Sequence, residues 1–373
     1  MGHSIVKILQ ITRQFYPSVG GIESVTLGLS KALRQEGLQC DVATLQYVFQ
    51  TKKRIPPFSM VEGVPVYRLR HIGGRRYPIV PGILSLSHDY DLLHIHAIDF
   101  FVDFLSLMQF EHQKPIVVST HGGIFHTRWL WPLKHLWFQT LTRLSLKNVS
   151  YIVADSKHDM ELFDSILPKN KLRYIPNGVD IQKLLIQERH PDLGLLVGIG
   201  RLFENKRVEW IIHAISQLKG KFPSLRLVWI GPGSAQQICH LNNLAAKSGI
   251  TDSVKFTGAI SITERDSYLA HAHLFVSAAR YEAFGVSTIE AMAAGVVPVV
   301  TSVGIHPEVV QSGINGWLWS GDVHSLIETL RQALDTTNGK LTEMGDLARL
   351  QTVRFQWESV AADYIELYEE SLR

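Results

Sequence analysis

The chain of 373 residues is poor in cysteine, in charge and in long apolar runs. Its two cysteines, Cys40 and Cys239, are too few for a disulfide framework or a zinc cluster, and this scarcity fits a reducing compartment. No stretch approaches the roughly 18 apolar residues of a transmembrane helix, and the N-terminus lacks a signal-peptide cleavage pattern. Charged residues make up 19% and hydrophobic residues 46%, a globular composition. We therefore expect a globular cytoplasmic protein that is soluble or peripheral to a membrane.

The small net charge of +3 hides an asymmetry between the two halves. Residues 1–187 hold 21 Lys and Arg against 14 Asp and Glu, a net +7. The remaining residues hold 16 against 20, a net −4. A basic half indicates an anionic partner, which can be lipid, nucleic acid or a phosphate-bearing substrate.

Short β-branched runs alternate with longer segments at helical spacing, and this alternation predicts parallel sheets with crossover helices. The predicted strands are residues 5–9, 40–45, 64–69, 92–96, 116–119, 151–154 and 172–175, then 195–200, 225–230, 254–257, 274–277 and 297–301. A polar break at 187–192 separates the two series. We predict an α/β protein of two doubly wound, Rossmann-like domains, 1–187 and 188–355, facing a cleft. A C-terminal helix, 356–373, is predicted to pack back toward the first domain.

The most informative motif is a pair of glutamates, Glu282 and Glu290, that flank a helix start. Gly285 permits a tight turn after Phe284, and the helix is predicted to begin near Val286. The free N–H groups and partial positive charge of a helix start attract anions. Two carboxylates beside an anion site suit a ligand that is part phosphate and part polyol, such as a sugar nucleotide.

Two loops after predicted strands carry phosphate-binding features. Gly20 and Gly21 follow the first strand, where a loop without Cβ atoms lets backbone amides approach a ligand. Arg201 and Lys206 follow the first strand of the second series. Arg offers a planar fork and Lys a point charge, and both suit phosphate oxygens.

His121 and Ser156 also stand just after predicted strands, in Thr-His-Gly-Gly and Ala-Asp-Ser. A lone histidine is more often structural, but its position at a strand end before two glycines favours a functional role. No Asp-x-Asp stands where a metal would bridge a diphosphate, so no metal is expected to be required.

These motifs, taken together, resemble family 4 of the retaining glycosyltransferases, whose fold is called GT-B. Glu282 and Glu290 correspond to that family's E-x7-E signature, with Ala283 where Gly is commoner. The resemblance implies a nucleotide-sugar-binding second domain and an acceptor-side first domain. It also implies front-face attack, in which the departing diphosphate takes the acceptor's proton.

The resemblance assigns a role to each candidate residue. His121, Glu282 and Lys206 are the implied catalytic residues, with His121 at the reacting carbon and Glu282 at the sugar hydroxyls. Glu290 would bind the ribose, and Ser156 would contact acceptor or sugar. The other implied donor-binding residues are Gly20, Gly21, Arg201, Phe284, Gly285 and Val286.

Further stretches resemble the α-1,3-mannosyltransferases of xanthan- and acetan-type exopolysaccharide synthesis. They begin at Arg13, Arg76, His94, Ser119 and Trp137. This resemblance implies GDP-mannose as donor and a polyprenyl-diphosphate-linked saccharide as acceptor. A UDP-sugar donor would leave every motif unchanged, so it stays an alternative, as does the less favoured nucleotide-sugar epimerase. Nucleic acid is not expected as a partner, since the sugar-nucleotide motifs account for the site.

Residues 125–137 mix aromatic and cationic side chains, including Trp129, Trp131, Arg128 and Lys134. Such a mixture suits a bilayer interface, and an ordinary packed helix that buries its tryptophans is the alternative. With the basic runs at 52–54 and 68–76, this segment predicts peripheral attachment to the anionic inner face of the cell membrane.

Overall fold

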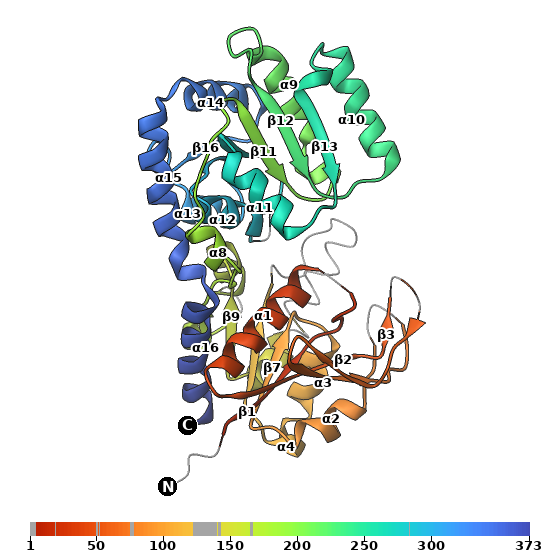
Figure 1. The fold of residues 1–373 in the computed structure, drawn as a ribbon. Helices are drawn as coiled ribbons and strands as arrows, with labels where there is room; N and C mark the ends of the chain where they lie inside the picture. Colours follow the sequence, from red (N-terminus) through yellow and green to blue (C-terminus); the bar gives the residue numbers. More distant parts are fainter. Residues whose placement is uncertain are drawn as a thin grey trace. The chain divides into compact units, whose positions relative to one another are not determined.

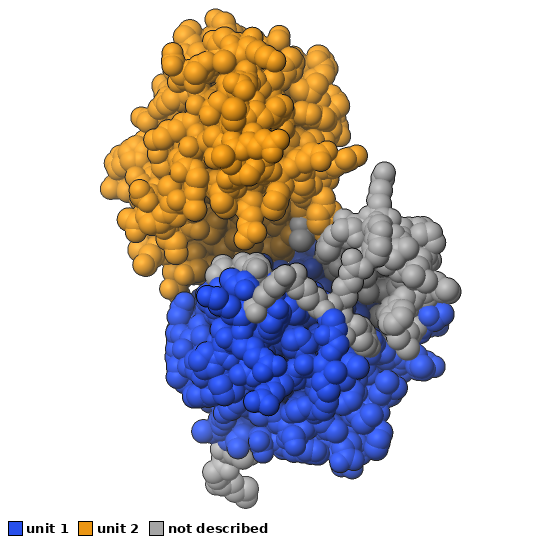
Figure 2. All heavy atoms as spheres, turned by 90° about the vertical axis from the view of Figure 1, so that its right-hand side faces the viewer, with its two compact units in different colours: residues 1–178, 357–373 blue, residues 179–356 orange. Residues whose placement is uncertain are grey.

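The computed structural model describes residues 5–18, 20–49, 51, 53–74, 78–121, 140, 143–164, 167–282 and 284–373. The chain forms two compact units (Figure 2). The first comprises Met1–Gly178 together with Trp357–Arg373, and the second comprises Val179–Gln356.

The first unit is built on an eight-stranded sheet in the order β10-β9-β8-β7-β1-β2-β6-β5 (Figure 1). All neighbouring strands are parallel except β5, which runs antiparallel to β6 at one edge. The strands are β1 (Lys7–Ile11), β2 (Gln39–Leu45), β5 (Phe58–Val61), β6 (Val64–Leu69), β7 (Leu92–His96), β8 (Ile116–Ser119), β9 (Tyr151–Ala154) and β10 (Leu172–Tyr174). A separate hairpin joins β3 (Tyr47–Val48) to β4 (Lys53–Arg54).

Helices cover both faces of this sheet because successive strand residues point to opposite sides. Ile8 packs with α1 (Gly21–Gln35) and α16 (Trp357–Leu372), whereas Leu9 packs with α3 (Phe100–Leu107) on the other face. A Cβ at Gly28 of α1 would collide with the Trp357 ring, so glycine allows the close approach of these two helices. The other helices in the described part of this unit are α2 (Gly82–Ser87), α4 (Gln109–His112), α6 (Arg143–Ser145) and α7 (Lys157–Asp164).

The second unit has a six-stranded, fully parallel sheet in the order β13-β12-β11-β14-β15-β16. Its strands are β11 (Leu195–Ile199), β12 (Arg226–Ile230), β13 (Val254–Gly258), β14 (Leu274–Ser277), β15 (Val297–Thr301) and β16 (Trp317–Trp319). Its helices are α8 (Gln182–Leu185), α9 (Val208–Leu218), α10 (Ala235–Lys247), α11 (Ile262–His271), α12 (Val286–Ala293), α13 (His306–Val309), α14 (Val323–Asp335) and α15 (Asn338–Thr352). The predicted fold class, two doubly wound Rossmann-like domains with a C-terminal helix, is confirmed.

Both sheets reverse their strand order at one place, and ligands of doubly wound sheets bind beside that place at the carboxyl ends of the strands. In the first unit the reversal lies between β1 and β7, and in the second between β11 and β14. The loops that follow β1, β11 and β14 carry candidate residues that the sequence singles out.

Candidate functional site

In the second unit, the loops after β11 and β14 meet through Lys206 and Glu282. Lys206 Nζ lies 2.5 Å from Glu282 Oε2, and these side chains are 16% and 19% exposed. Gly200, with φ of +151°, leaves space for the lysine, because a Cβ there would stand 3.0 Å from Lys206 Cε. A cation and a carboxylate are thus held together at the switch point, the place between β11 and β14 where the strand order of the sheet reverses, and both are within reach of solvent. Arg201 lies on the same loop with an exposed side chain.

Two residues beside this pair fasten the two loops together. The Asn205 side chain donates to Tyr281 O at 2.8 Å and accepts from Tyr281 N at 3.0 Å. The Arg207 guanidinium donates to Ala278 O at 2.7 Å and to Gly321 O at 3.1 Å. The sequence analysis missed both residues, although their place on either side of Lys206 is the signal that could have indicated them.

The start of α12 has the features of an anion site. Gly285 has φ of +95°, which favours glycine, and a Cβ there would stand 3.1 Å from His306 Nε2. His306 donates from Nδ1 to Thr301 O at 2.8 Å, and its Nε2 contacts Thr288 Oγ1 at 2.9 Å. Burial lowers the pKa of His306, so the ring is neutral and accepts from Thr288. This buried histidine, which the sequence analysis did not single out, shapes the turn.

The side chains around this turn differ in exposure. Phe284 is 4% exposed and packs edge-on against Phe355 at 5.7 Å, so its ring anchors the loop in the core. Val286, the first residue of α12, is 41% exposed. The first N–H groups of a helix have no acceptor within the helix and can bind a ligand.

Glu290 lies one turn into α12 and bonds to Arg265 of α11. Its Oε1 accepts from Arg265 Nη1 at 2.6 Å, and the two side chains are 12% and 19% exposed. Burial raises the pKa of Glu290, and the guanidinium opposes that rise. Arg265 also forms an ion pair with Asp266, its neighbour in sequence, so one guanidinium pairs with two carboxylates. Arg265 is a site residue that no sequence motif indicated.

In the first unit, His121 follows β8 and closes a row of three stacked imidazoles. Its ring lies 5.1 Å from that of His96, whose ring lies 4.4 Å from that of His94. His121 Nε2 is 2.8 Å from His96 Nδ1, and His121 Nδ1 is 3.8 Å from Asp155 Oδ2. The His121 side chain is only 5% exposed, so its ring is enclosed within the unit.

The row continues into the interior of the unit as a polar network. Gln10 Oε1 accepts from His96 Nε2 at 2.6 Å. His94 lies 2.7 Å from Tyr368 Oη of α16 and 2.8 Å from Ser119 Oγ. Desolvation by burial lowers the pKa values of His94 and His96 well below normal. The C-terminal helix is thereby linked to the candidate histidine through hydrogen bonds.

The glycine-rich loop leads directly into α1. Gly20 is the N-cap residue of that helix and Gly21 its first residue. A Cβ at Gly21 would meet no protein atom within 4 Å, so the fold itself does not require glycine there. Ser156 lies before α7, is 3% exposed and accepts from Asp159 N at 3.2 Å, a helix-capping bond.

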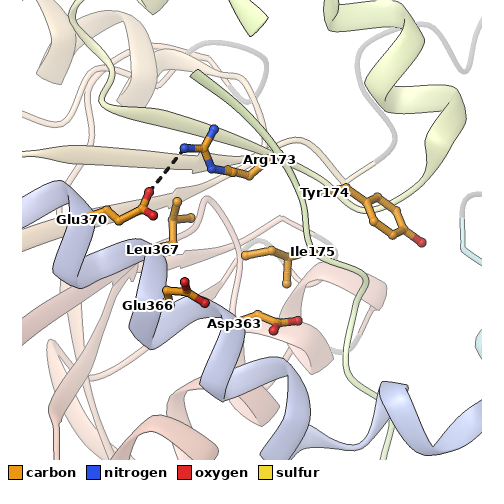
Figure 3. A pocket seen from close by; sticks show the side chains of 7 residues that line it. All are labelled: Arg173, Tyr174, Ile175, Asp363, Glu366, Leu367 and Glu370. Carbon is orange, nitrogen blue, oxygen red and sulfur yellow. Dashed lines mark hydrogen bonds and ion pairs between the residues drawn. The ribbon is translucent and has the colours of Figure 1, made fainter. Parts of the chain in front are cut away.

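A pocket of about 290 Å³ lies between β10 and α16 (Figure 3). Asp363, Glu366 and Glu370 line one side of it, and Arg173 donates to Glu370 Oε2 at 3.3 Å. None of the predicted site residues lines it.

The described residues contain neither a metal-binding cluster nor a membrane-spanning helix. No group of three or more His, Cys, Asp or Glu side chains in the described ranges is arranged to hold a metal ion. Within the same ranges, every helix is too short or too polar to cross a bilayer. The aromatic segment 125–137 and the basic residues Lys52, Arg75 and Arg76 lie outside the described residues.

Comparisons with known proteins cover the whole chain. The family pattern "Glycosyltransferase Family 4" matches residues 19–183, and "Glycosyl transferases group 1" matches residues 181–350. The GDP-mannose:cellobiosyl-diphosphopolyprenol alpha-mannosyltransferase of Komagataeibacter xylinus is 33% identical, covering 100% of this chain and 95% of its own. The enzyme of the same name from Xanthomonas oryzae pv. oryzae is 31% identical, with coverages of 98% and 97%. The structure of Anabaena Alr3699/HepE in complex with UDP superposes with a TM-score of 0.78 at 19% identity, covering 98% and 100% of the two chains.

The family patterns and the relatives therefore show a glycosyltransferase, and the superposition shows the GT-B fold. The chain belongs to glycosyltransferase family 4, as its sequence predicts.

Proposed function

We propose that the protein transfers mannose from GDP-mannose, with retention of the α configuration, to a polyprenyl-diphosphate-linked oligosaccharide in exopolysaccharide synthesis. The observation that supports transferase chemistry is the contact of Lys206 with Glu282 beside the start of α12. The choice of donor and acceptor is supported by two relatives that resemble the chain from end to end and carry these substrates in their names.

We assign each candidate residue of the second unit a role that fits its surroundings. Lys206 and Arg201 contact the donor phosphates and stabilise the charge that develops as the diphosphate leaves. Glu282 keeps Lys206 in place through one carboxylate oxygen, and its other oxygen accepts from a sugar hydroxyl. The free N–H groups at Gly285 and Val286 bind phosphate oxygen, and Glu290, fixed by Arg265, accepts from the ribose.

The reaction proceeds on one face of the sugar. The acceptor hydroxyl oxygen bonds to the anomeric carbon as the bond from that carbon to the phosphate oxygen breaks, and the hydroxyl proton passes to the departing diphosphate. His121 contacts the donor sugar near the reacting carbon, and Ser156 lies toward the acceptor. Gly20 and Gly21 let the substrate approach backbone N–H groups, and the empty space around Gly21 fits this role. No metal is required in this scheme.

A lipid-linked acceptor places the reaction at the inner face of the cell membrane. The positive charge of residues 1–187 favours an anionic surface, and each Lys or Arg near such a surface contributes on the order of 1 kcal/mol. We propose a cytoplasmic protein attached peripherally through residues 125–137 and the nearby basic runs. Sedimentation with anionic vesicles should then decrease as salt rises, and vesicles that never retain the protein would contradict this attachment.

A donor panel tests the proposed function. Purified protein is incubated with a lipid-linked saccharide extract and with labelled GDP-mannose, UDP-glucose or UDP-N-acetylglucosamine. Label should enter the lipid fraction from GDP-mannose. If label enters only from a UDP-sugar, that sugar nucleotide is the donor instead of GDP-mannose. If a sugar nucleotide is isomerised without any acceptor, the protein is an epimerase.

A further inference from the structure

A second concave site in the first unit is lined by basic residues that the proposed roles leave unused. It has a volume of about 190 Å³ and is lined by Gln46, Tyr47, Arg54, Arg70 and His71. Gln46 follows β2 and Arg70 follows β6, and these parallel strands pair in register at Leu45 and Leu69. The pocket therefore lies at the carboxyl edge of the sheet, where doubly wound folds bind ligands.

The β3–β4 hairpin forms one wall of this pocket and is fastened on two sides. Gln46 donates to Ile55 O at 2.9 Å and, from its backbone, to Leu69 O at 2.8 Å. Gln14, in the loop after β1, donates to Tyr47 O at 3.0 Å and accepts from Phe49 N at 3.3 Å. The same glutamine accepts from Ser18 Oγ at 3.2 Å. The pocket is thus connected to the loop that leads to Gly20.

The positive charge around this pocket is not neutralised by the described part of the chain. Arg68 is 6% exposed, and among the described residues its guanidinium bonds to the neutral oxygens of Pro56, Ser59 and Tyr16. Burial alone lowers its pKa. The ion pairs that the described residues of the first unit form leave out Arg54, Arg68 and Arg70. Arg54 and Arg70, which line the pocket, therefore have no carboxylate partner among these ion pairs, and an anionic ligand can pair with them.

Among the residues that line the pocket, hydrogen-bond donors outnumber acceptors. Arg54 and Arg70 offer two guanidinium forks, Tyr47 a hydroxyl and His71 a ring N–H. Guanidinium forks match phosphate oxygens in pairs and bind them more strongly than neutral donors do. A ligand for this pocket therefore carries several clustered anionic oxygens.

We propose that this pocket binds the diphosphate that joins the acceptor saccharide to its lipid. This inference rests on the proposed function, because that function supplies an acceptor with a diphosphate. The saccharide of such an acceptor extends from the pocket along the carboxyl edge, and the lipid leaves on the other side of the diphosphate. The two arginines thereby determine that the enzyme uses a diphosphate-linked acceptor.

The test compares two acceptors, of which only one carries a diphosphate. One is a short-chain prenyl-diphosphate cellobioside, and the other is an alkyl cellobioside of equal chain length. The double variant Arg54→Ala/Arg70→Ala should raise KM for the diphosphate acceptor at least about tenfold, since charged hydrogen bonds are lost. The KM for the alkyl cellobioside should change less than about twofold, because it lacks the anion. Arg54→Lys/Arg70→Lys keeps the charge without the fork and should lie between the two.

Arg173→Ala is the matched control, since it removes one positive charge from an exposed ion pair on β10 of the same unit. It should leave both KM values unchanged. Far-ultraviolet circular dichroism and thermal unfolding check that all variants fold.

Three outcomes would overturn the inference. Equal increases of KM for both acceptors would mean that the arginines shape the sugar site, and unchanged KM values would mean that the pocket binds nothing in the reaction. If the double variant instead loses binding to phosphatidylglycerol vesicles that contain no acceptor, the pocket binds lipid headgroups. If the parent transfers no mannose to either acceptor, the proposed function fails. In that case, calorimetric titration with the prenyl-diphosphate cellobioside still tests whether the pocket binds the diphosphate. The parent should bind this acceptor more tightly than the double variant, and equal affinities would overturn the inference.

Discussion

Lys206 Nζ and Glu282 Oε2 lie 2.5 Å apart, and this contact joins the loops that follow β11 and β14 at the switch point of the second sheet. Asn205 and Arg207, on either side of the lysine, bind the backbone of the glutamate's loop. The cation that is proposed to face the leaving group is therefore held in place before any ligand arrives.

Removing either partner of this contact should reduce turnover strongly. Lys206→Ala and Glu282→Ala are each expected to lower kcat about a hundredfold while leaving a folded protein, because each loses a charged contact that strengthens as the phosphate leaves. The double variant should lose less than the product of the two effects, since the residues are in contact. Lys221→Ala, which breaks the exposed pair with Asp335, is the control and should keep full activity. Folded variants with parental rates would refute the site assignment.

The turn before α12 should tolerate no side chain at Gly285. Gly285→Ala places a Cβ at positive φ and 3.1 Å from His306 Nε2, so the free energy of unfolding should fall by about 2 kcal/mol. Gly249→Ala is the matched control, because Gly249 also has positive φ but no atom near the added Cβ, and it should cost about 1 kcal/mol. Urea denaturation measures both. Equal losses would show that the contact with His306 is unimportant.

Folding stability should decline as pH falls through the ordinary pKa of histidine. His94 and His96 are buried with pKa values lowered chiefly by desolvation, so they stay neutral in the folded protein. The unfolded chain takes up protons below about pH 6.5, and each such histidine then reduces stability by up to about 1.4 kcal/mol per pH unit. Urea denaturation between about pH 7 and pH 5.5 measures the slope. His96→Gln should flatten it, and a parent whose stability is constant over this window would contradict the assignment.

Activity should survive excess chelator. The proposed scheme stabilises the departing diphosphate with Lys206, Arg201 and helix N–H groups, so no cation has to bridge it. Transfer of mannose is measured after incubation with EDTA and again after addition of magnesium or manganese. Activity that disappears with the chelator and returns with either metal would show that the leaving group is stabilised differently.

The repeated strands of the two sheets could be predicted closely from sequence. Residues 116–119, 151–154, 274–277 and 297–301 were predicted as strands and form β8, β9, β14 and β15 with the same bounds. Buried parallel strands are continuous apolar runs, and such runs are easily recognised. The hairpin β3–β4 was missed because its residues, Tyr47–Val48 and Lys53–Arg54, are too few to show a period. The helices α14 and α15 were also missed, although Asp322 and Thr337 cap them at their starts.

The candidate residues on strand ends could be found because strand-end position and residue type are both visible in the sequence. The residues that hold these candidates in place could not be found in the same way. Arg265 reaches Glu290 from a different helix, and His306 reaches the Gly285 turn from residues that follow β15. Such contacts depend on how helices pack side by side, which spacing within one segment does not determine. The His94-x-His96 pattern in an otherwise apolar strand was a visible sign of the buried polar network.

The anomeric configuration of the product tests the central claim most directly. GDP-mannose and a diphosphate-linked cellobiose acceptor are incubated with the protein, and the released trisaccharide is examined by proton NMR. The account predicts a new α-mannosyl residue formed by the parent and at least about a hundredfold slower formation by Glu282→Ala. A β-mannosyl product, or no mannose on the acceptor while another sugar nucleotide is used, would contradict it.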